Sequence, residues 1–531
     1  MLAIFLFAVC FCFLASLINS PSHDIVSQTK KLSQQQVIKI VTAIPKEQAD
    51  NQSILSVEFN LGNGIKNQSI ACQQLMPASR AAFEENGTKI SPNGNGRKEG
   101  TERGKQGDNG NSSTTLAAFQ TVNSVPLASD GMLAFALRND IATNLLNEET
   151  IQNHKIEKIP KIAQEELMYD KKIINEAVHK SRLVVIEKIQ EFVETKSYLS
   201  GAYKPLYDLL TDYPFRVGKM LRPTMCISIA RAVGGMGHSA LTSASALELY
   251  HNAFLIHDDI EDGSESRRGK GTLHQLIGIP RAINVGDATN VLAVGLLLEN
   301  LSVIGVSKAL NVLHEIEFMA QQSVEGQAME LDWVATNASH LTDQDYFKMC
   351  VKKTCWYSFI TPCRIGFIVG HPSANVKDMV EHLAGLTRFG MILGIAFQIQ
   401  DDLLNLQGQL EAYGKEIGGD IYEGKRTLML NHVLANSGKE SEKILEILAL
   451  PREKKTTDQL AFIIEKMECC GSIEHGWKVA RSLSNRAAEI FESLDFLQPE
   501  TPIRPEEQWV CSVHDRRFLK ELINYVIYRN A

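Results

Sequence analysis

The sequence predicts an all-α body behind a long polar extension. From about residue 166 to residue 531, apolar residues recur at intervals of three, four and seven, as on the buried face of a helix. Regular strand alternation is absent from this part of the sequence, and all five Asn-Gly pairs, which favour hairpin turns, precede residue 115. Residues 91–113 contain no apolar residue apart from a proline, so they cannot contribute to a core.

Composition excludes several classes of protein. Acidic residues outnumber Lys and Arg by 62 to 54, which gives a net charge of −8 and argues against a nucleic-acid partner, because such proteins need a basic surface. Apolar residues at 44% and charged residues at 22% are typical of a globular chain, which excludes a mostly disordered or polytopic membrane protein. The 10 cysteines have no zinc-ligand spacing, and we interpret them as core thiols.

Residues 1–20 are predicted to form a hydrophobic anchor or a signal-like segment. The only polar residue up to Ile18 is Ser16, and an apolar run of this length is a candidate membrane span. Lysines follow it at residues 30–46, so the positive-inside tendency predicts a cytoplasmic body, with membrane association through this segment. Whether the segment is cleaved, serves as an anchor or reflects a start codon placed too far upstream stays open.

Residues 21–165 are predicted to be a low-complexity, mostly disordered extension. Weak alternation within residues 56–70, around Gly62-Asn63-Gly64, predicts a hairpin there. The helical pattern then occupies residues 166–531, with clear apolar stripes in several runs. These runs are residues 174–192, 241–262, 346–360, 383–407 and 518–528.

The run that ends near residue 262 carries the first acidic cluster, Asp258, Asp259 and Asp262. Positions i and i+4 share a helix face, so Asp258 and Asp262 project together, with Phe254 one turn before them. Clustered carboxylate oxygens suit Mg²⁺, which shares its coordination sphere with substrate phosphates. The alternative is a solvated acidic helix end, which any short motif of this kind allows.

A second acidic cluster, Asp401-Asp402, ends the helical run of residues 383–407. Gly390 and Gly394 precede it on the same face and would let another helix or a long ligand approach closely. Two such helices placed opposite each other would form a slot with an acidic mouth and an apolar throat. That shape suits a molecule with a diphosphate head and a hydrocarbon tail.

Cationic residues occur where a diphosphate would need them. Charge-assisted hydrogen bonds from several of them could hold a trianionic group. The cations in question are Lys219, Arg222, Arg267, Arg268, Lys353 and Lys425.

The ordered set of motifs resembles the trans-isoprenyl diphosphate synthases, and most of all geranylgeranyl diphosphate synthases. In chain order the motifs are Gly-Lys-x-x-Arg-Pro from Gly218, Asp-Asp-x-x-Asp from Asp258 with Arg-Arg-Gly, Gly-Gln, Lys353-Thr354, Phe-Gln-x-x-Asp-Asp from Phe397, and Gly-Lys-x-Thr. The resemblance spans residues 172–529. It implies an isoprenoid-synthase-type helical bundle around a deep apolar cavity, one prenyltransferase domain over residues 166–531, and a homodimer.

The resemblance also implies the reaction and the residue roles. An allylic diphosphate ionises, the double bond of isopentenyl diphosphate attacks in a head-to-tail (1'-4) condensation, and a proton is lost. The implied Mg²⁺ ligands are Asp258, Asp259, Asp262 and Asp401. Arg267, Lys353 and Lys425 would contact the allylic head group, whereas Lys219, Arg222, His251 and Arg268 would bind isopentenyl diphosphate. Lys353, Thr354 and Gln398 form the implied catalytic set, with Thr354 and Gln398 beside the allylic carbon.

Two further positions bear on product and activity. In the family, a small residue at the position of Ala253 opens room beyond the fifteen-carbon stage, and a bulky one at the position of Phe254 limits growth. Together they favour a twenty-carbon product, with fifteen- and twenty-five-carbon products as the alternatives. Asn405 stands where the family has a further Asp, and this removes a charge at the metal edge.

Two alternatives stay open at this point. The chain could be a noncatalytic regulatory subunit of such a synthase. It could also be a class I terpene cyclase, although the nearest candidate for the second metal triad of a cyclase, at Asn139, Thr143 and Asn147, lies upstream of the helical body.

Overall fold

The computed structural model describes residues 55–57, 70–72, 170–199, 201–216, 218–407, 417–498 and 513–528. The apolar segment at residues 1–20, the predicted extension of residues 21–165 apart from 55–57 and 70–72, and the triad from Asn139 to Asn147 lie outside the described residues. The chain forms two units, Met1–Gln120 and Thr121–Ala531. In the first, β1 (Leu55–Val57) pairs antiparallel with β2 (Ile70–Cys72), with Ser56 opposite Ala71, as expected for the predicted hairpin.

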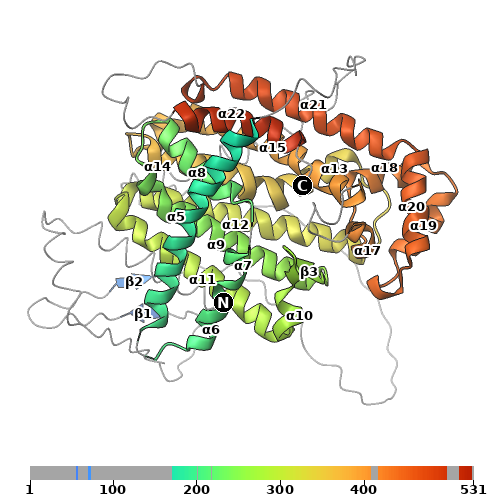
Figure 1. The fold of residues 1–531 in the computed structure, drawn as a ribbon, viewed down its shortest axis with the longest axis horizontal. Coiled ribbons are helices and arrows are strands. Elements are labelled where there is room, and N and C mark those ends of the chain that lie inside the picture. Colours follow the sequence, from blue (N-terminus) through green and yellow to red (C-terminus); the bar gives the residue numbers. More distant parts are fainter. Residues whose placement is uncertain are drawn as a thin grey trace, which may run out of the picture. The chain divides into compact units, whose positions relative to one another are not determined.

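The described part of the second unit is helical apart from one short hairpin, which confirms the all-α prediction (Figure 1). Its hairpin consists of β3 (Ser266–Arg267) and β4 (Lys270–Gly271). The helices are α5 (Lys171–Ser197), α6 (Lys204–Leu210), α7 (Asp212–Phe215), α8 (Leu221–Ala232), α9 (Gly237–Glu261), α10 (Leu273–Ile277), α11 (Ile279–Val303), α12 (Val306–Ala335), α13 (Asp343–Cys350), the π-helix η1 (Val351–Ile360), α14 (Thr361–Gly370), the 3-10 helix η2 (Val376–Met379), α15 (Val380–Gln407), α17 (Gly419–Glu423), α18 (Leu428–Asn436), α19 (Glu440–Leu448), the 3-10 helix η3 (Arg452–Lys454), α20 (Thr457–Cys469), α21 (Ser472–Glu492), the 3-10 helix η4 (Asp495–Leu497) and α22 (Val513–Tyr528).

Side-chain caps fix where several helices begin. The Asp170 carboxylate accepts the N–H groups of Lys172 and Ile173 at 2.9 and 3.3 Å and starts α5. Thr342 and Asp345 form a reciprocal capping box at the start of α13, and Thr456 does the same with its third following residue at α20. These caps satisfy N–H groups that a helix leaves without intrahelical partners.

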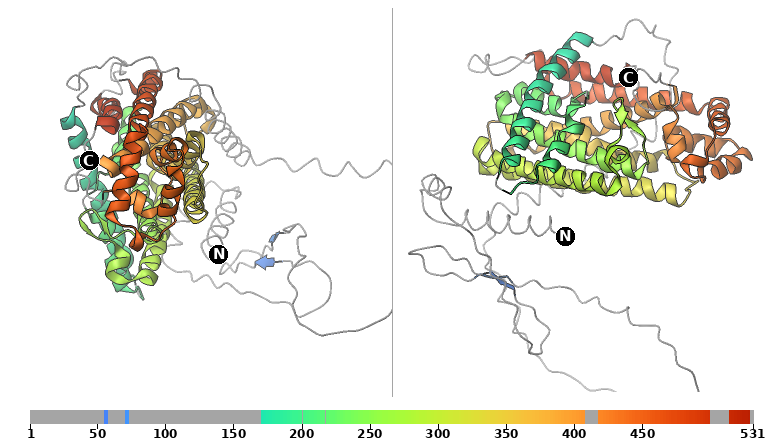
Figure 2. Two further views of the ribbon diagram at one scale, coloured as in Figure 1. Left: turned by 90° about the vertical axis from the view of Figure 1, so that its right-hand side faces the viewer. Right: turned by 60° about the horizontal axis from the view of Figure 1, so that its bottom comes forward.

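The core forms where long apolar helices pack side by side. Helix α9 packs on α11 and α8, while α15 packs on α21 and η1. Figures 1 and 2 show α12 and α15 running lengthwise through the body, with α18, α19 and α20 gathered at one end. Helices α9 and α15 are buried along most of their length, and their acidic clusters lie at their carboxyl-terminal ends.

Glycines set the spacing between η1 and its neighbours. A Cβ on Gly394 would lie 2.7 Å from the sulfur of Cys355, and one on Gly390 would lie 3.0 Å from the backbone of Ile360. A Cβ on Gly326 of α12 would overlap the backbone of Lys353. The close approach predicted for the α15 glycines is therefore confirmed, and the neighbour that they admit is η1.

Two described helical segments are long and apolar enough to cross a membrane by length and composition alone. They are Ile279–Val303 and Val376–Gln407, whose most apolar windows are 44% and 72% buried inside the bundle. Packing in the core accounts for most of the apolar character of the second. Cytoplasmic localisation with anchoring through residues 1–20 stays a prediction.

Candidate active site

The acidic end of α9 is followed at once by a basic hairpin. Asp258 and Asp259 lie in the last turn of α9, and Asp262 caps the helix with its N–H bonded to the Asp258 carbonyl at 2.8 Å. The hairpin reverses at Arg268 and Gly269, with φ values of 55° and 74°. Two successive positive φ values are typical of a type I′ turn, which folds Arg267 back toward the carboxylates.

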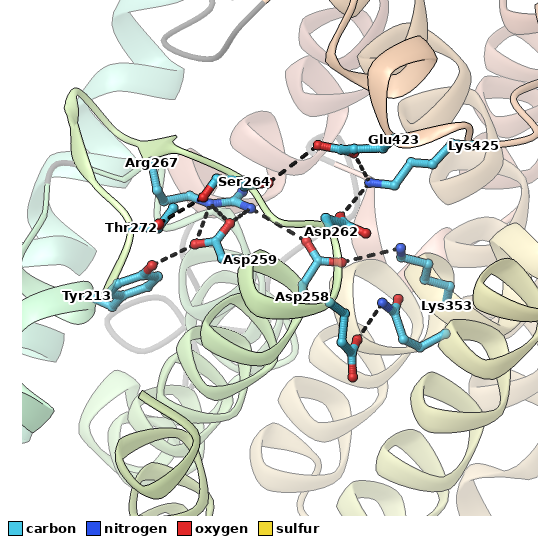
Figure 3. A network of polar contacts seen from close by, with 12 residues as sticks. Tyr213, Asp258, Asp259, Asp262, Ser264, Arg267, Thr272, Lys353, Glu423 and Lys425 are labelled. Atoms are coloured by element: carbon cyan, nitrogen blue, oxygen red, sulfur yellow. Dashed lines mark hydrogen bonds and ion pairs between the residues drawn. The ribbon is translucent and has the colours of Figure 1, made fainter. Parts of the chain in front are cut away.

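Asp259 is fully buried and is held by two protein donors. The Tyr213 hydroxyl donates to its Oδ2 at 2.6 Å, and Arg267 Nε donates to its Oδ1 at 2.9 Å (Figure 3). Burial, the Asp259 charge and this hydrogen bond raise the pKa of Tyr213 well above its ordinary value. The resemblance implies a metal ligand at Asp259, whereas the structure directs this carboxylate to Arg267 and away from the mouth.

Asp258 and Asp262 face two lysines, and Asp258 Oδ2 also lies 3.5 Å from Arg267 Nη2. Lys353 Nζ lies 3.4 Å from Asp258 Oδ1 and also pairs with Glu330 of α12. Lys425 Nζ lies 2.6 Å from Asp262 Oδ2 and 2.8 Å from Glu423 Oε2. Figure 3 shows both lysines reaching toward the end of α9 from the side opposite Arg267.

The burial of Asp262 shifts the pKa of its carboxyl group. Removal from water raises the pKa of Asp262 to about 7, with Asp258 and Glu423 adding to the rise and Lys425 opposing it. In the described part of the chain, no three His, Cys, Asp or Glu side chains are grouped closely enough to enclose a metal ion by themselves. A site built from Asp258 and Asp262 would therefore rely on substrate oxygens to complete its ligands, as Mg²⁺ sites commonly do.

The second acidic cluster is organised by a chain of hydrogen bonds. Thr354 Oγ1 donates to Gln398 Oε1 at 2.8 Å, and Gln398 Nε2 donates to Asp402 Oδ1 at 2.8 Å. The Tyr346 hydroxyl donates to the other oxygen of Asp402 at 2.6 Å. Burial raises the pKa of Asp402 to about 7, although both hydrogen bonds lower it. Asp402 thus lies inside the bundle, while Asp401 is partly exposed.

Helix η1 connects the two acidic ends. Its neighbouring residues Lys353 and Thr354 contact Asp258 of α9 and Gln398 of α15 respectively. A cavity of about 380 Å³ opens beside these groups, and both α9 and α15 contribute to its wall. Its lining includes Asp258, Asp262, Arg267, Asn405, Lys425 and Arg452.

Asn405, which lines this cavity, accepts two backbone hydrogen bonds at the start of α17. Its side-chain oxygen accepts the N–H of Asp420 at 3.2 Å, and its carbonyl accepts the N–H of Gly418 at 2.7 Å. These bonds fix the beginning of α17, the short helix that carries Glu423 at its end. A neutral amide therefore serves the fold where the resemblance leads one to expect a further carboxylate.

Three of the four residues predicted to bind isopentenyl diphosphate, Arg222, His251 and Arg268, form a second basic cluster, whereas Lys219 Nζ lies 6.0 Å from the ring centroid of Tyr525. Arg222 Nη1 lies 3.2 Å from His251 Nε2, and Arg222 Nη2 donates to Ser358 at 2.6 Å. Arg268 donates to the Tyr213 carbonyl at 3.1 Å and lies against Gly218, the residue before the exposed Lys219. Burial raises the pKa of Glu248 at this cluster, while Arg268, Arg222 and Arg182 lower it.

Aromatic side chains line the region below the acidic mouth. The Tyr357 ring lies 5.8 Å from the Phe254 ring, edge-on, and 5.8 Å from the stacked His251 ring. Arg222 lies over the same tyrosine, with its Cζ 4.5 Å from the ring centroid. Ala253 is fully buried beside them. Tyr357 thus contacts both the second basic cluster and Phe254, the predicted floor.

Several of these residues were not identified from the sequence. Tyr357 has a local signal, because it follows Lys353 by four residues in the same helix. Tyr213, Glu330 and Glu423 belong to other elements, and no spacing along the chain connects them to the acidic motifs.

Comparisons with known proteins agree on one family. A family model described as polyprenyl synthetase matches residues 204–467. The geranylgeranyl pyrophosphate synthase of Geoglobus acetivorans is 30% identical over 363 residues, which cover 67% of this chain and 100% of that protein. The octaprenyl diphosphate synthase of Escherichia coli K12 is 31% identical over 54% of this chain and 82% of its own length. The crystal structure of geranylgeranyl pyrophosphate synthetase from Pyrococcus horikoshii matches with a TM-score of 0.56 and 29% identity, covering 67% and 98% of the two chains.

Because Asp259 is buried and Asp258 is partly exposed, the same substitution should lower the stability of the protein much more at Asp259 than at Asp258. Asp259→Asn removes the main counter-charge of the buried Arg267 guanidinium and leaves it only the 3.5 Å contact with Asp258, so the free energy of unfolding should fall by about 3–5 kcal/mol. Asp258→Asn alters a side chain that is 23% exposed, and unfolding should change by no more than about 1 kcal/mol. Urea denaturation of both variants measures the difference, and equal stability losses would contradict the assignment.

Proposed function

The chain belongs to the polyprenyl synthetase family, and from that premise we propose that it joins isopentenyl diphosphate to an allylic prenyl diphosphate by head-to-tail (1'-4) condensation. The carbon–oxygen bond of the allylic substrate breaks, a carbon–carbon bond to isopentenyl diphosphate forms, and one proton and one diphosphate are released. The observation that carries the proposal is the pair Lys353-Thr354, which contacts the acidic end of α9 on one side and Gln398 of α15 on the other.

Charge at the mouth supports ionisation of the allylic substrate. Asp258, Asp262 and Asp401 would hold Mg²⁺, which when bound neutralises charge on the departing diphosphate. Lys353 and Lys425 lie at the same carboxylates and can turn to the diphosphate oxygens once substrate enters. Arg267, fixed by Asp259, adds positive charge to the cavity wall without leaving its partner.

Thr354 and Gln398, which lie behind the residues that line the cavity, would face the allylic carbon where positive charge develops. Because the Thr354 hydroxyl donates its proton to Gln398 Oε1, the lone pairs of Oγ1 remain available to face an electron-poor carbon. The aromatic rings of Tyr357 and Phe254 exclude water that would otherwise capture a carbocation. No nucleophilic side chain is needed.

The second basic cluster would hold isopentenyl diphosphate, the substrate that keeps its diphosphate. Arg222 and His251 lie within hydrogen-bonding distance of each other and supply donors beside the Tyr357 ring. Lys219 and Arg268 approach from the chain before α8 and from the hairpin after α9. This arrangement keeps the head groups of the two substrates in separate clusters, and the diphosphate that leaves the allylic substrate would take up the lost proton.

Product formation tests the proposal directly. Purified full-length protein with Mg²⁺, isopentenyl diphosphate and dimethylallyl, geranyl or farnesyl diphosphate should yield longer prenyl diphosphates detected by mass spectrometry. Asp401→Asn should lower the rate roughly 10²- to 10³-fold, because it removes a group that stabilises the leaving charge. Failure to form any product would support a noncatalytic subunit, and a cyclic hydrocarbon formed without isopentenyl diphosphate would support a cyclase.

We further propose a twenty-carbon product, because Phe254 closes the throat one turn below Asp258. Its ring packs on Tyr357 and lies 6.2 Å from the ring of Tyr250. Phe254→Ala should lengthen the product by one or more five-carbon units, as measured by mass spectrometry of the reaction mixture. Phe462→Ala on α20 removes a ring elsewhere and should leave product length unchanged. An unaltered product from Phe254→Ala would rule out this ring as the floor.

A homodimer is the assembly that we propose, because α11 exposes an apolar face. Ile279, Ile283 and Val291 are 51%, 43% and 60% exposed and fall within about 120° of one another around this helix. A second copy could cover this face through a two-fold, self-complementary contact.

Substitution on this face should separate the copies. Val291→Arg should convert a dimer into a monomer in sedimentation velocity, because it would bury an unpaired charge in the contact. Leu183→Arg changes a 58% exposed residue on α5 and should leave the dimer intact. A wild-type protein that sediments as a monomer would refute the homodimer.

A further inference from the structure

Arg452 lies at the rim of the cavity but belongs to none of the motifs recognised in the sequence. It is the first residue of η3, the 3-10 helix Arg452–Lys454, which follows α19. The same cavity is lined by Asp258, Asp262 and Lys425. The Arg452 side chain is 22% exposed, and its Cζ lies 5.6 Å from the Tyr422 ring centroid. A long, partly exposed cation is thus placed at the entrance to the proposed allylic site.

Glu423 connects Arg452 to the residues already assigned to that site. Arg452 Nη1 lies 3.3 Å from Glu423 Oε1, and Lys425 Nζ lies 2.8 Å from the other oxygen of the same carboxylate. Ser264, in the loop after α9, donates to Glu423 Oε1 at 3.4 Å. Glu423 therefore holds two cations from different segments side by side, and one of them, Lys425, reaches Asp262.

The cations around the cavity differ in how firmly their carboxylate partners hold them. Arg267 is held by the buried Asp259 and cannot leave without stranding that carboxylate. Lys425 and Arg452 share the two oxygens of Glu423, whose side chain is 11% exposed, and a diphosphate entering here would offer both cations another anion. The guanidinium fork of Arg452 also matches two phosphate oxygens at once, which an ammonium group does not.

Lys455 is a further cation close to Arg452. Lys455, three residues along the chain, donates to the Tyr422 carbonyl at 2.8 Å. Burial, followed by the charges of Arg426 and Arg452, lowers the pKa of Lys455 to about 8. Arg426 and Arg452 therefore lie close enough to Lys455 for their charges to act on it, in addition to the larger effect of burial.

Resting on the function proposed above, we propose that Arg452 is a further diphosphate-binding residue of the allylic site. Its guanidinium exchanges Glu423 Oε1 for oxygens of the allylic diphosphate, while Lys425 makes the corresponding exchange from the other oxygen of Glu423. The competing explanation is a purely structural ion pair that fastens η3 to α17. The two differ in substrate selectivity, since a structural tie would not discriminate between the allylic substrate and isopentenyl diphosphate.

Steady-state kinetics on full-length protein separates these explanations. Arg452→Gln should raise KM for the allylic diphosphate roughly ten- to hundredfold, the effect of losing one charge-assisted contact. KM for isopentenyl diphosphate should stay within about twofold. Arg452→Lys should recover part of the loss, because charge returns without the fork. Lys454→Gln on the same 3-10 helix alters an exposed cation and should match the wild type.

The outcomes that would overturn the inference are distinct from failure of the proposed function. An active wild type whose allylic KM is unchanged in Arg452→Gln, or equal increases in both KM values, would refute the role of Arg452 and leave the function standing. A wild type that forms no product would refute the function. In that case, calorimetric titration of inorganic pyrophosphate with Mg²⁺ decides on Arg452, and equal affinity of wild type and Arg452→Gln would refute its part in diphosphate binding.

Discussion

The site depends on keeping carboxylates charged at the ends of two buried helices. A carboxylate removed from water loses hydration that only close cations, hydrogen-bond donors or metal ions can replace. The structure meets this need differently at each position: Asp259 has Arg267 and Tyr213, Asp262 has Lys425, and Asp402 has Gln398 and Tyr346. The more completely a carboxylate is satisfied by the protein, the less it can offer to a ligand. This ordering separates structural carboxylates from those that face the cavity.

The π-helix η1 distributes its side chains over both proposed substrate sites. Lys353 and Thr354 reach the two acidic ends, while Tyr357 and Ser358, about one turn later, reach Arg222 of the second basic cluster. Wide π-type turns are frequent at functional sites because they re-aim side chains that a regular α-helix would send elsewhere. The close packing admitted by Gly326 and Gly394 holds this segment against α12 and α15. Both substrates would therefore be positioned from a single rigid element.

Patterns along the chain predicted the helices and much of the site, but not the partners that come from other elements. Periodicity identified the all-α body, and spacing of four residues placed Asp258 and Asp262 on one face. The prediction that Arg222 and His251 act together is supported by their contact. By contrast, Tyr213 is 46 residues from Asp259, and Glu330 is 23 residues from Lys353. Such pairs follow from how helices cross, and crossing depends on packing of whole surfaces. For the same reason, the sequence did not predict that Asn405 accepts a hydrogen bond from the backbone of α17.

The ion pair between Asp262 and Lys425 affects both the stability of the fold and the proposed binding of substrate. An acid whose folded pKa is about 7, as at Asp262, keeps its proton in the folded state at pH values where the unfolded chain has lost it. Raising the pH from about 4 through 7 therefore favours the unfolded chain at this position, and above pH 7 the full penalty applies. Lys425 offsets part of that penalty, and a metal ion with its diphosphate would offset more. In the proposed reaction, a bound metal ion and diphosphate would relieve this penalty at Asp262, and that gain would favour the exchange of Lys425 from Asp262 to the substrate.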